Sequence, residues 1–132
     1  MPRLAALALL LALALAGCGA SSNSASDFDG AERDVADAIE ELEKAAQEDE
    51  PGRICEDLLA KDVLTTIGSD CTGKIAKAID TTDQFALTVE DVTVTGTTAK
   101  ARVETGLDEE KVETVELVKE GDDWKVAGLP AA

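Results

Sequence analysis

The side chains that are able to carry chemistry in this sequence are few in kind. The chain of 132 residues contains 28 aspartates and glutamates and three cysteines, but no histidine and no tyrosine. Histidine is the commonest general base and the commonest metal ligand in proteins, so its absence removes most catalytic and metal-binding patterns. We therefore expect no catalytic residue, no metal and no cofactor.

The net charge of the chain excludes two further classes of binding partner. Only 12 lysines and arginines oppose the 28 acids, which gives a formal charge of −16. The phosphates of a nucleic acid would repel such a chain, and it lacks the basic residues of a protein that binds anionic membrane surfaces. Nucleic acid is therefore not an expected partner.

The first residues read as a targeting segment. A single positive charge at Arg3 precedes an apolar run from Leu4 to Ala16. This run spans about 20 Å as a helix, which is short of the roughly 30 Å of a bilayer core. The pattern is typical of a secretory signal peptide rather than a membrane-spanning helix.

The run ends in a sequence, Leu15-Ala16-Gly17-Cys18, that resembles the lipobox of bacterial lipoproteins. The resemblance implies a signal peptide at 1–17, cleavage before Cys18 and diacylation of its sulfur, and two acyl chains give a stable membrane anchor. Residues 18–26 would then be a lipidated cysteine and a flexible tether of small polar residues. We expect the protein at the extracytoplasmic face of the cell membrane; ordinary secretion is the alternative.

Lipidation of Cys18 leaves Cys55 and Cys71 as a pair. A secreted domain with two such cysteines is expected to form one disulfide. Two thiolates are too few for a zinc site, and their spacing is too wide for a redox C-x-x-C motif. The bond would close a loop of 17 residues, which the chain-entropy model values at about 3 kcal/mol.

Residues 27–132 form one predicted domain, which begins with an acidic amphipathic helix over 27–50. Asp29 or Asp27 is its expected N-cap, and the Pro51-Gly52 pair is its expected end. The segment holds 11 acids against two bases, which we interpret as a solvated face that keeps the protein soluble. The predicted apolar stripe is Val35, Ala38, Ile39, Leu42, Ala45 and Ala46.

Two further helical segments follow. The apolar spacing of residues 53–67 predicts a helix, or two short helices with a bend near Lys61-Asp62, and residues 72–80 predict another. Cys55 and Cys71 would join these segments.

The period changes to two from Phe85 onward. The alternation of Phe85, Leu87 and Val89 shifts parity to Val92 and Val94, which predicts a bulge. Turns are expected at Gly96 and over 120–123, and a longer loop over 106–109. The result is an antiparallel meander of about four strands in an α+β fold, the last strand carrying Trp124, Val126 and Leu129.

The order of these parts resembles small bacterial lipoproteins, especially those of actinobacteria, whose domains of unknown function belong to the nuclear-transport-factor-2-like (cystatin-like) superfamily. The resemblance rests on Ile54-Cys55 and Leu58-Leu59, on Cys71, and on the strand sequences VEDVTVTGTTAKARVE and VELVKEGDDWKVAGL. It covers about residues 30–130, and it implies helices packed on a curved sheet that encloses a cone-shaped cavity.

The expected function is a non-catalytic, membrane-anchored domain that binds a small apolar ligand or a protein partner of the cell envelope. One alternative is an isomerase or dehydratase on the same fold. Enzymes of that superfamily use an Asp base or an Asp–His pair, often with tyrosines, so a buried acid near Asp80, Asp83 or Asp91 would be needed. A scaffold or assembly protein of the envelope is the other alternative.

Three aromatic residues complete the sequence-based expectations. Trp124 is expected in the core, with its indole N–H bonded to a nearby acceptor, rather than as a platform on which a ligand stacks. Phe28 and Phe85 are expected to pack at the interface between helix and sheet.

Overall fold

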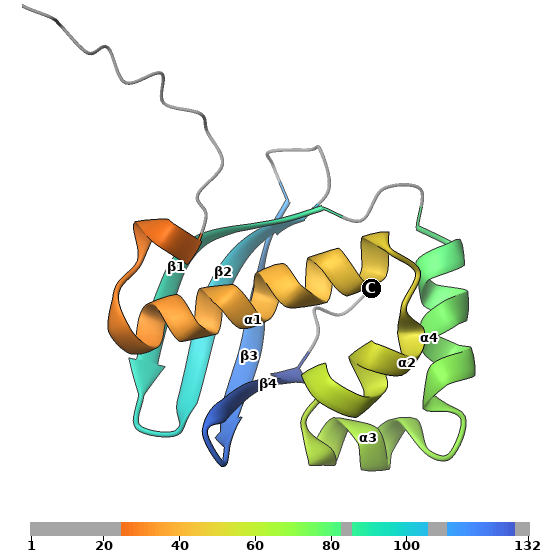
Figure 1. Cartoon of the computed structure of the whole chain (residues 1–132). Coiled ribbons are helices and arrows are strands. Elements are labelled where there is room, and N and C mark those ends of the chain that lie inside the picture. Colours follow the sequence, from red (N-terminus) through yellow and green to blue (C-terminus); the bar gives the residue numbers. More distant parts are fainter. Residues whose placement is uncertain (1–24, 83–85, 106–110, 129–132) are drawn as a thin grey trace, which may run out of the picture.

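The structure is a computed structural model, which describes residues 25–82, 86–105 and 111–128. One long helix crosses the face of a curved antiparallel sheet, and shorter helices gather at the end of that helix (Figure 1). This confirms the predicted α+β fold with helices packed on a curved sheet. The signal peptide, Cys18, Phe85, Asp83, Leu129 and the 106–109 loop lie outside the described residues.

The long helix α1 (Gly30–Gln47) follows a short 3-10 turn, η1 (Ala25–Asp27). Asp29 is its N-cap, one of the two predicted, although its side chain makes no capping hydrogen bond. The buried stripe differs slightly from the prediction, because Ala36 is fully buried while Ala38 is only half-buried. Ala25, which the sequence places in the tether, is buried against the core.

Pro51 begins a helical segment, so the prediction that it ends the first helix is wrong. Helix α1 already stops at Gln47, and the chain turns through Asp49, whose φ of 56° lies in the left-handed region. Pro51 is then the first residue of α2 (Pro51–Arg53). Proline is well suited there, because the first helical residues have no partner for their N–H groups within the helix.

The helical segment continues as one π-helical turn, η2 (Ile54–Leu58), in which the Leu59 N–H bonds the Ile54 carbonyl at 3.1 Å. The chain is extended at Leu59 and Ala60 and resumes as α3 (Lys61–Ile67). The predicted break therefore exists, about two residues earlier than expected. Helix α4 (Cys71–Asp80) completes the helical half.

A disulfide joins Cys55 in η2 to Cys71 at the start of α4, and their Cα atoms are 6.1 Å apart. This is the predicted pair. Helix α3 lies wholly inside the loop that the bond closes, and none of its residues is fully buried. The bond therefore holds α4 against η2 where apolar packing is thin.

The sheet has four strands in sequence order, each antiparallel to the next: β1 (Leu87–Thr95), β2 (Thr98–Thr105), β3 (Val112–Glu120) and β4 (Asp123–Gly128). The register shifts between Val89 and Asp91, which confirms the bulge predicted from the change of parity. A second shift, which the sequence pattern does not predict, lies between Glu116 and Leu117.

Both expected hairpin turns are present. Thr95 pairs with Thr98, and Glu120 pairs with Asp123, so each loop has two residues. Gly96 and Gly121 take the first loop position with φ of 60° and 64°, the left-handed conformation that two-residue hairpins require and glycine adopts without strain.

Strand β4 is attached to the helical half as well as to β3. Leu59 forms a parallel bridge with Val126, and the Ala60 N–H donates to the Val126 carbonyl at 2.9 Å. The Lys61 N–H donates to the Glu120 carboxylate at 3.0 Å. These bonds fix the π-helical turn beside the edge of the sheet.

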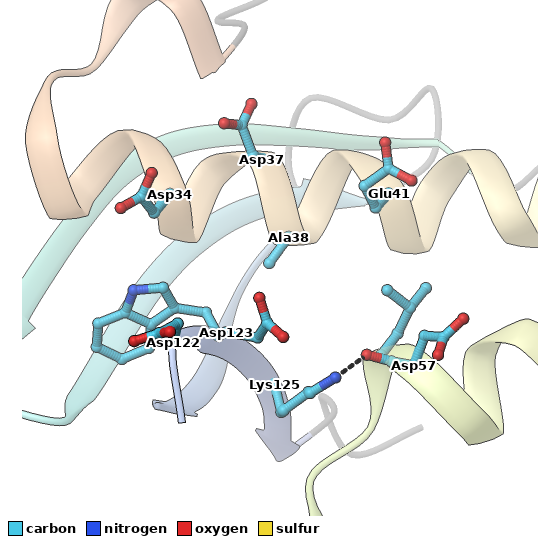
Figure 2. A pocket seen from close by; sticks show the side chains of 10 residues that line it. Asp34, Asp37, Ala38, Glu41, Asp57, Asp122, Asp123 and Lys125 are labelled. Carbon is cyan, nitrogen blue, oxygen red and sulfur yellow. Dashed lines mark hydrogen bonds between the residues drawn. The ribbon is translucent and has the colours of Figure 1, made fainter. Parts of the chain in front are cut away.

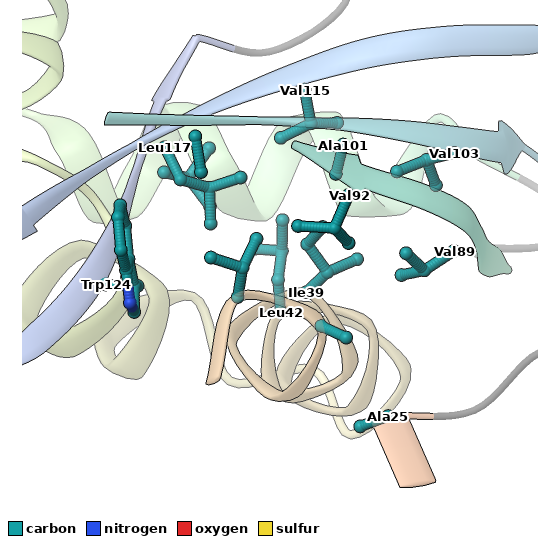
Figure 3. Packing of buried hydrophobic residues seen from close by; sticks show 14 of the residues in the cluster. Ala25, Ile39, Leu42, Val89, Val92, Ala101, Val103, Val115, Leu117 and Trp124 are labelled. Atoms are coloured by element: carbon teal, nitrogen blue, oxygen red, sulfur yellow. The ribbon is translucent and has the colours of Figure 1, made fainter. Parts of the chain in front are cut away.

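Figure 3 shows how the core fills the space between α1 and the sheet. Ile39 and Leu42 point from the helix toward Val92, Ala101 and Leu117 on the strands, and Trp124 closes one side. Small side chains on both partners, among them Ala36 and Ala101, allow close approach. No described helix is long and apolar enough to cross a bilayer.

We predict that Ile39→Ala lowers the free energy of unfolding by about 2–5 kcal/mol, because it opens a cavity in the centre of this core. Ile75→Ala on α4 is the control, since Ile75 is only half-buried. It removes the same atoms from a less enclosed site and should cost less. Urea unfolding measures both; equal losses would contradict the placement of Ile39.

Replacing both Cys55 and Cys71 by serine should lower the free energy of unfolding by about 3 kcal/mol, because the unfolded chain regains the freedom of the closed loop. Urea unfolding of the oxidised wild type and the double variant measures the difference. A thiol count on the denatured, unreduced wild type checks the bond. Two reactive thiols at these positions, or equal stabilities, would contradict the assignment.

Candidate functional site

An acidic groove with a volume of about 430 Å³ lies between α1, η2 and the β3–β4 hairpin (Figure 2). Six of its lining residues carry carboxylates, one is a lysine and three are apolar. They are Asp34, Asp37, Ala38, Glu41, Asp57, Leu58, Asp122, Asp123, Trp124 and Lys125. The name acidic groove is used below for this set.

Helix α1 supplies one wall. Asp34, Asp37 and Glu41 are spaced by three and four residues, which puts their side chains on one face of a helix. These acids lie beside the buried stripe of Val35, Ile39 and Leu42 and not on the opposite side of the helix. They therefore lie along the edge of the contact between α1 and the sheet. Figure 2 shows the three carboxylates in a row along α1, above the hairpin.

The opposite wall comes from two segments distant in sequence. Asp57 belongs to the π-helical turn, Asp122 lies in the β3–β4 turn, and Asp123 is the first residue of β4. The bridge between Leu59 and Val126 brings these segments together. Trp124 and Lys125 follow on β4 and line the groove beneath the acids.

The charge of the groove is largely uncompensated by its own lining. Lys125 is the single base among the lining residues, and its Nζ donates to the backbone carbonyl of Asp57 rather than to a carboxylate (Figure 2). Carboxylates gathered along low-dielectric walls raise the local concentration of positively charged ligands.

One acid of the groove has a basic partner from outside it. Arg53 forms ion pairs with Glu41 and with Glu50, the latter at 3.3 Å. The hydrogen bond with Glu50, together with the charge of Glu41, raises the pKa of the Arg53 guanidinium, so it stays positively charged. Because these side chains are partly exposed, the pairs position the helices more than they stabilise them.

The remaining acids of α1 show that its polar face is not uniformly solvated. Glu40 accepts the backbone N–H of Ala25 at 2.6 Å, and Glu43 accepts the backbone N–H of Leu87. These carboxylates fasten η1 and the start of β1 to the helix. The interpretation of the acidic face as solvent-facing therefore covers only part of it.

The acids do not form a metal centre. Among residues 25–82, 86–105 and 111–128, no three or more His, Cys, Asp or Glu side chains are arranged to hold a metal ion.

A second, apolar hollow lies between α1, η2 and α4, with a volume of about 120 Å³. Its lining is Leu42, Ala46, Ile54, Leu59, Ile75, Ala78, Ile79 and Thr82. Pockets that enclose drug-sized ligands are typically about 300–1,000 Å³, so this hollow is too small for them.

The candidate residues from the sequence fall in different places. Cys55 and Cys71 meet in the disulfide, away from the acidic groove. Asp80 and Asp91 are exposed, and none of the described residues is a buried polar or charged side chain. Neither Asp80 nor Asp91 therefore lies in the enclosed site that a catalytic base of this kind needs.

Two properties were expected of Trp124, a position in the core and a hydrogen bond from its indole N–H, and only the first is confirmed. Its side chain is in the core, with 7% of the residue exposed. Its indole N–H makes no hydrogen bond with any other residue that the structure describes.

The sequence pattern did not predict the acidic groove. The spacing of Asp34, Asp37 and Glu41 is a visible signal for that wall, but nothing in sequence order connects it with Asp57 or Asp122. Only the packing of β4 beside η2 does so.

Comparison of the chain with protein-family models, with curated proteins and with solved structures gives no match.

Proposed function

We propose that this protein is a lipid-anchored, extracytoplasmic binding protein without catalytic activity, and that its acidic groove holds a positively charged part of an envelope partner. The observation that carries the proposal is the convergence of six carboxylates from three segments on one groove of about 430 Å³, with a single lysine among them.

Binding is favoured over catalysis by the kinds of residue present. The chain has no histidine or tyrosine, and the face of the sheet on which a cone-shaped active site would open is covered by α1 and its apolar side chains. An isomerase needs an acid or base held in an enclosed site. The exposed Asp80 and Asp91 offer no such setting.

A charged partner is favoured over a small apolar ligand by size and by chemistry. The apolar hollow is about 120 Å³, whereas the acidic groove has more than three times that volume. The formal charge of −16 adds a long-range attraction for basic surfaces. The same charge disfavours contact with anionic lipids, so the groove is expected to face a protein.

The proposed lipid anchor at Cys18 would determine where the protein acts. A diacylated Cys18, as the lipobox resemblance implies, would hold the domain at the outer face of the membrane. Residues 19–24 would serve as its tether, because Ala25 and Ser26 belong to η1. Partners in the same membrane would then meet the groove at a raised local concentration.

The groove is tested with the full chain in neutral detergent, titrated with spermidine at low salt by calorimetry. Asp34→Asn with Asp37→Asn should weaken binding about fivefold, because two exposed ion pairs contribute about 1 kcal/mol together. Glu32→Gln with Glu48→Gln is the matched control, since it removes two charges outside the groove lining. Added salt should weaken binding to the wild type.

Two results would refute the groove as the binding site. One is a lack of measurable spermidine binding at low salt. The other is an equal loss in both double variants, which would mean that the overall charge of the chain, and not the groove, attracts the cation.

The anchor is tested by mass spectrometry of the native protein from membranes. The wild type should begin at Cys18 and carry the added mass of at least two acyl chains, and Cys18→Ala should carry none. Ser22→Ala in the tether is the control and should be acylated as the wild type. An unmodified Cys18 sulfur in the wild type would contradict the anchor.

A further inference from the structure

The indole of Trp124 is a hydrogen-bond donor for which the described residues provide no partner. The residue is 7% exposed and lines the acidic groove. No fully buried side-chain nitrogen or oxygen of the described residues lacks a partner. The indole nitrogen, which bonds none of these residues, is therefore not fully buried, and it reaches the groove that the ring lines.

The indole N–H and the carboxylates of the acidic groove each need a different chemical group on a ligand. The carboxylates of Asp34, Asp37 and Asp122 accept hydrogen bonds and attract positive charge, whereas an indole N–H can only donate. Metal ions and polyamines have positive charge but no acceptor, so they leave the indole unpaired. A ligand that satisfies both carries cationic groups beside a neutral carbonyl.

We propose that the occupant of the acidic groove is a polypeptide segment containing lysine or arginine, and that one of its backbone carbonyls accepts a hydrogen bond from the Trp124 indole. In such a segment each basic side chain has a backbone carbonyl beside it, so both kinds of group recur along the chain. The proposal rests on the proposed function and names the chemistry of the partner.

The groove has groups that could bind both the basic side chains and the backbone of such a segment. Asp34 and Asp37 line one side and Asp122 and Asp123 the other, so basic side chains leaving the peptide in opposite directions reach carboxylates. Trp124 lines the same groove as both pairs of acids, so a peptide backbone that contacts the indole would bring its side chains near them. A second copy of this chain does not fit as the partner, because its formal charge is also −16.

The test compares two probes of equal charge on the full chain in neutral detergent at low salt. One is spermidine, and the other is a capped peptide in which three lysines alternate with glycines. The peptide should bind about fivefold more tightly, the effect of one additional hydrogen bond. In Trp124→Phe, which keeps a ring but has no N–H, the ratio of the two affinities should fall to about one. The control Glu32→Gln with Glu48→Gln should keep the ratio of the wild type.

A second measurement does not depend on the folding of the variant. Trp124 is the only tryptophan of the chain, so tryptophan emission of the wild type reports on this indole alone. The peptide should shift the emission maximum, and spermidine at equal occupancy should shift it less.

The outcomes separate the two proposals. Equal affinities for both probes, with equal effects on the emission, would overturn the peptide proposal and leave the groove as a site for cations. Peptide binding that survives Asp34→Asn with Asp37→Asn undiminished would place the peptide elsewhere and overturn it too. Failure of both probes to bind would refute the proposed function itself.

Discussion

The apolar stripe of α1 has to cover the single apolar face of the sheet, and the rest of the structure follows from that contact. Ile39 and Leu42 meet the inward residues of the strands, and small residues such as Ala36 and Ala101 bring the two backbones close. The outward positions of the strands carry mainly Thr, Lys, Arg and Glu, so the sheet has no second face able to exclude water. Because α1 occupies the inner face, the acidic groove lies at the margin between α1 and β4.

The same contact determines how the acids of α1 are used. Positions that cannot face the core must face neighbouring segments or solvent, and the carboxylates there take two roles. Glu40 and Glu43 accept backbone N–H groups of Ala25 and Leu87, so they help to hold η1 and β1 in place. Asp34 and Asp37 line the acidic groove, for which the Leu59–Val126 bridge supplies the opposite wall. Acids that hold neighbouring segments and acids that line the groove thus lie within one helix.

The features that the sequence predicts are those encoded by local periodicity. The helix of 27–50, the bulge near Val89 and the turn at Gly96 each have a signal within a few residues. The error at Pro51 arises because proline is compatible both with the end of one helix and with the first turn of the next. The acidic groove was not predictable, because Asp57 meets Asp122 only through packing between segments more than 60 residues apart. The unpaired indole depends on the same packing.

The disulfide between Cys55 and Cys71 has a further consequence wherever the chain meets a peptidase. Helix α3 has no fully buried residue and lies within the covalent loop, and exposed segments are where chains are most readily cut. A single cut anywhere between Glu56 and Asp70 would leave both fragments joined through sulfur. The fragment that carries α1 and the fragment that carries the strands would therefore stay together after one cleavage.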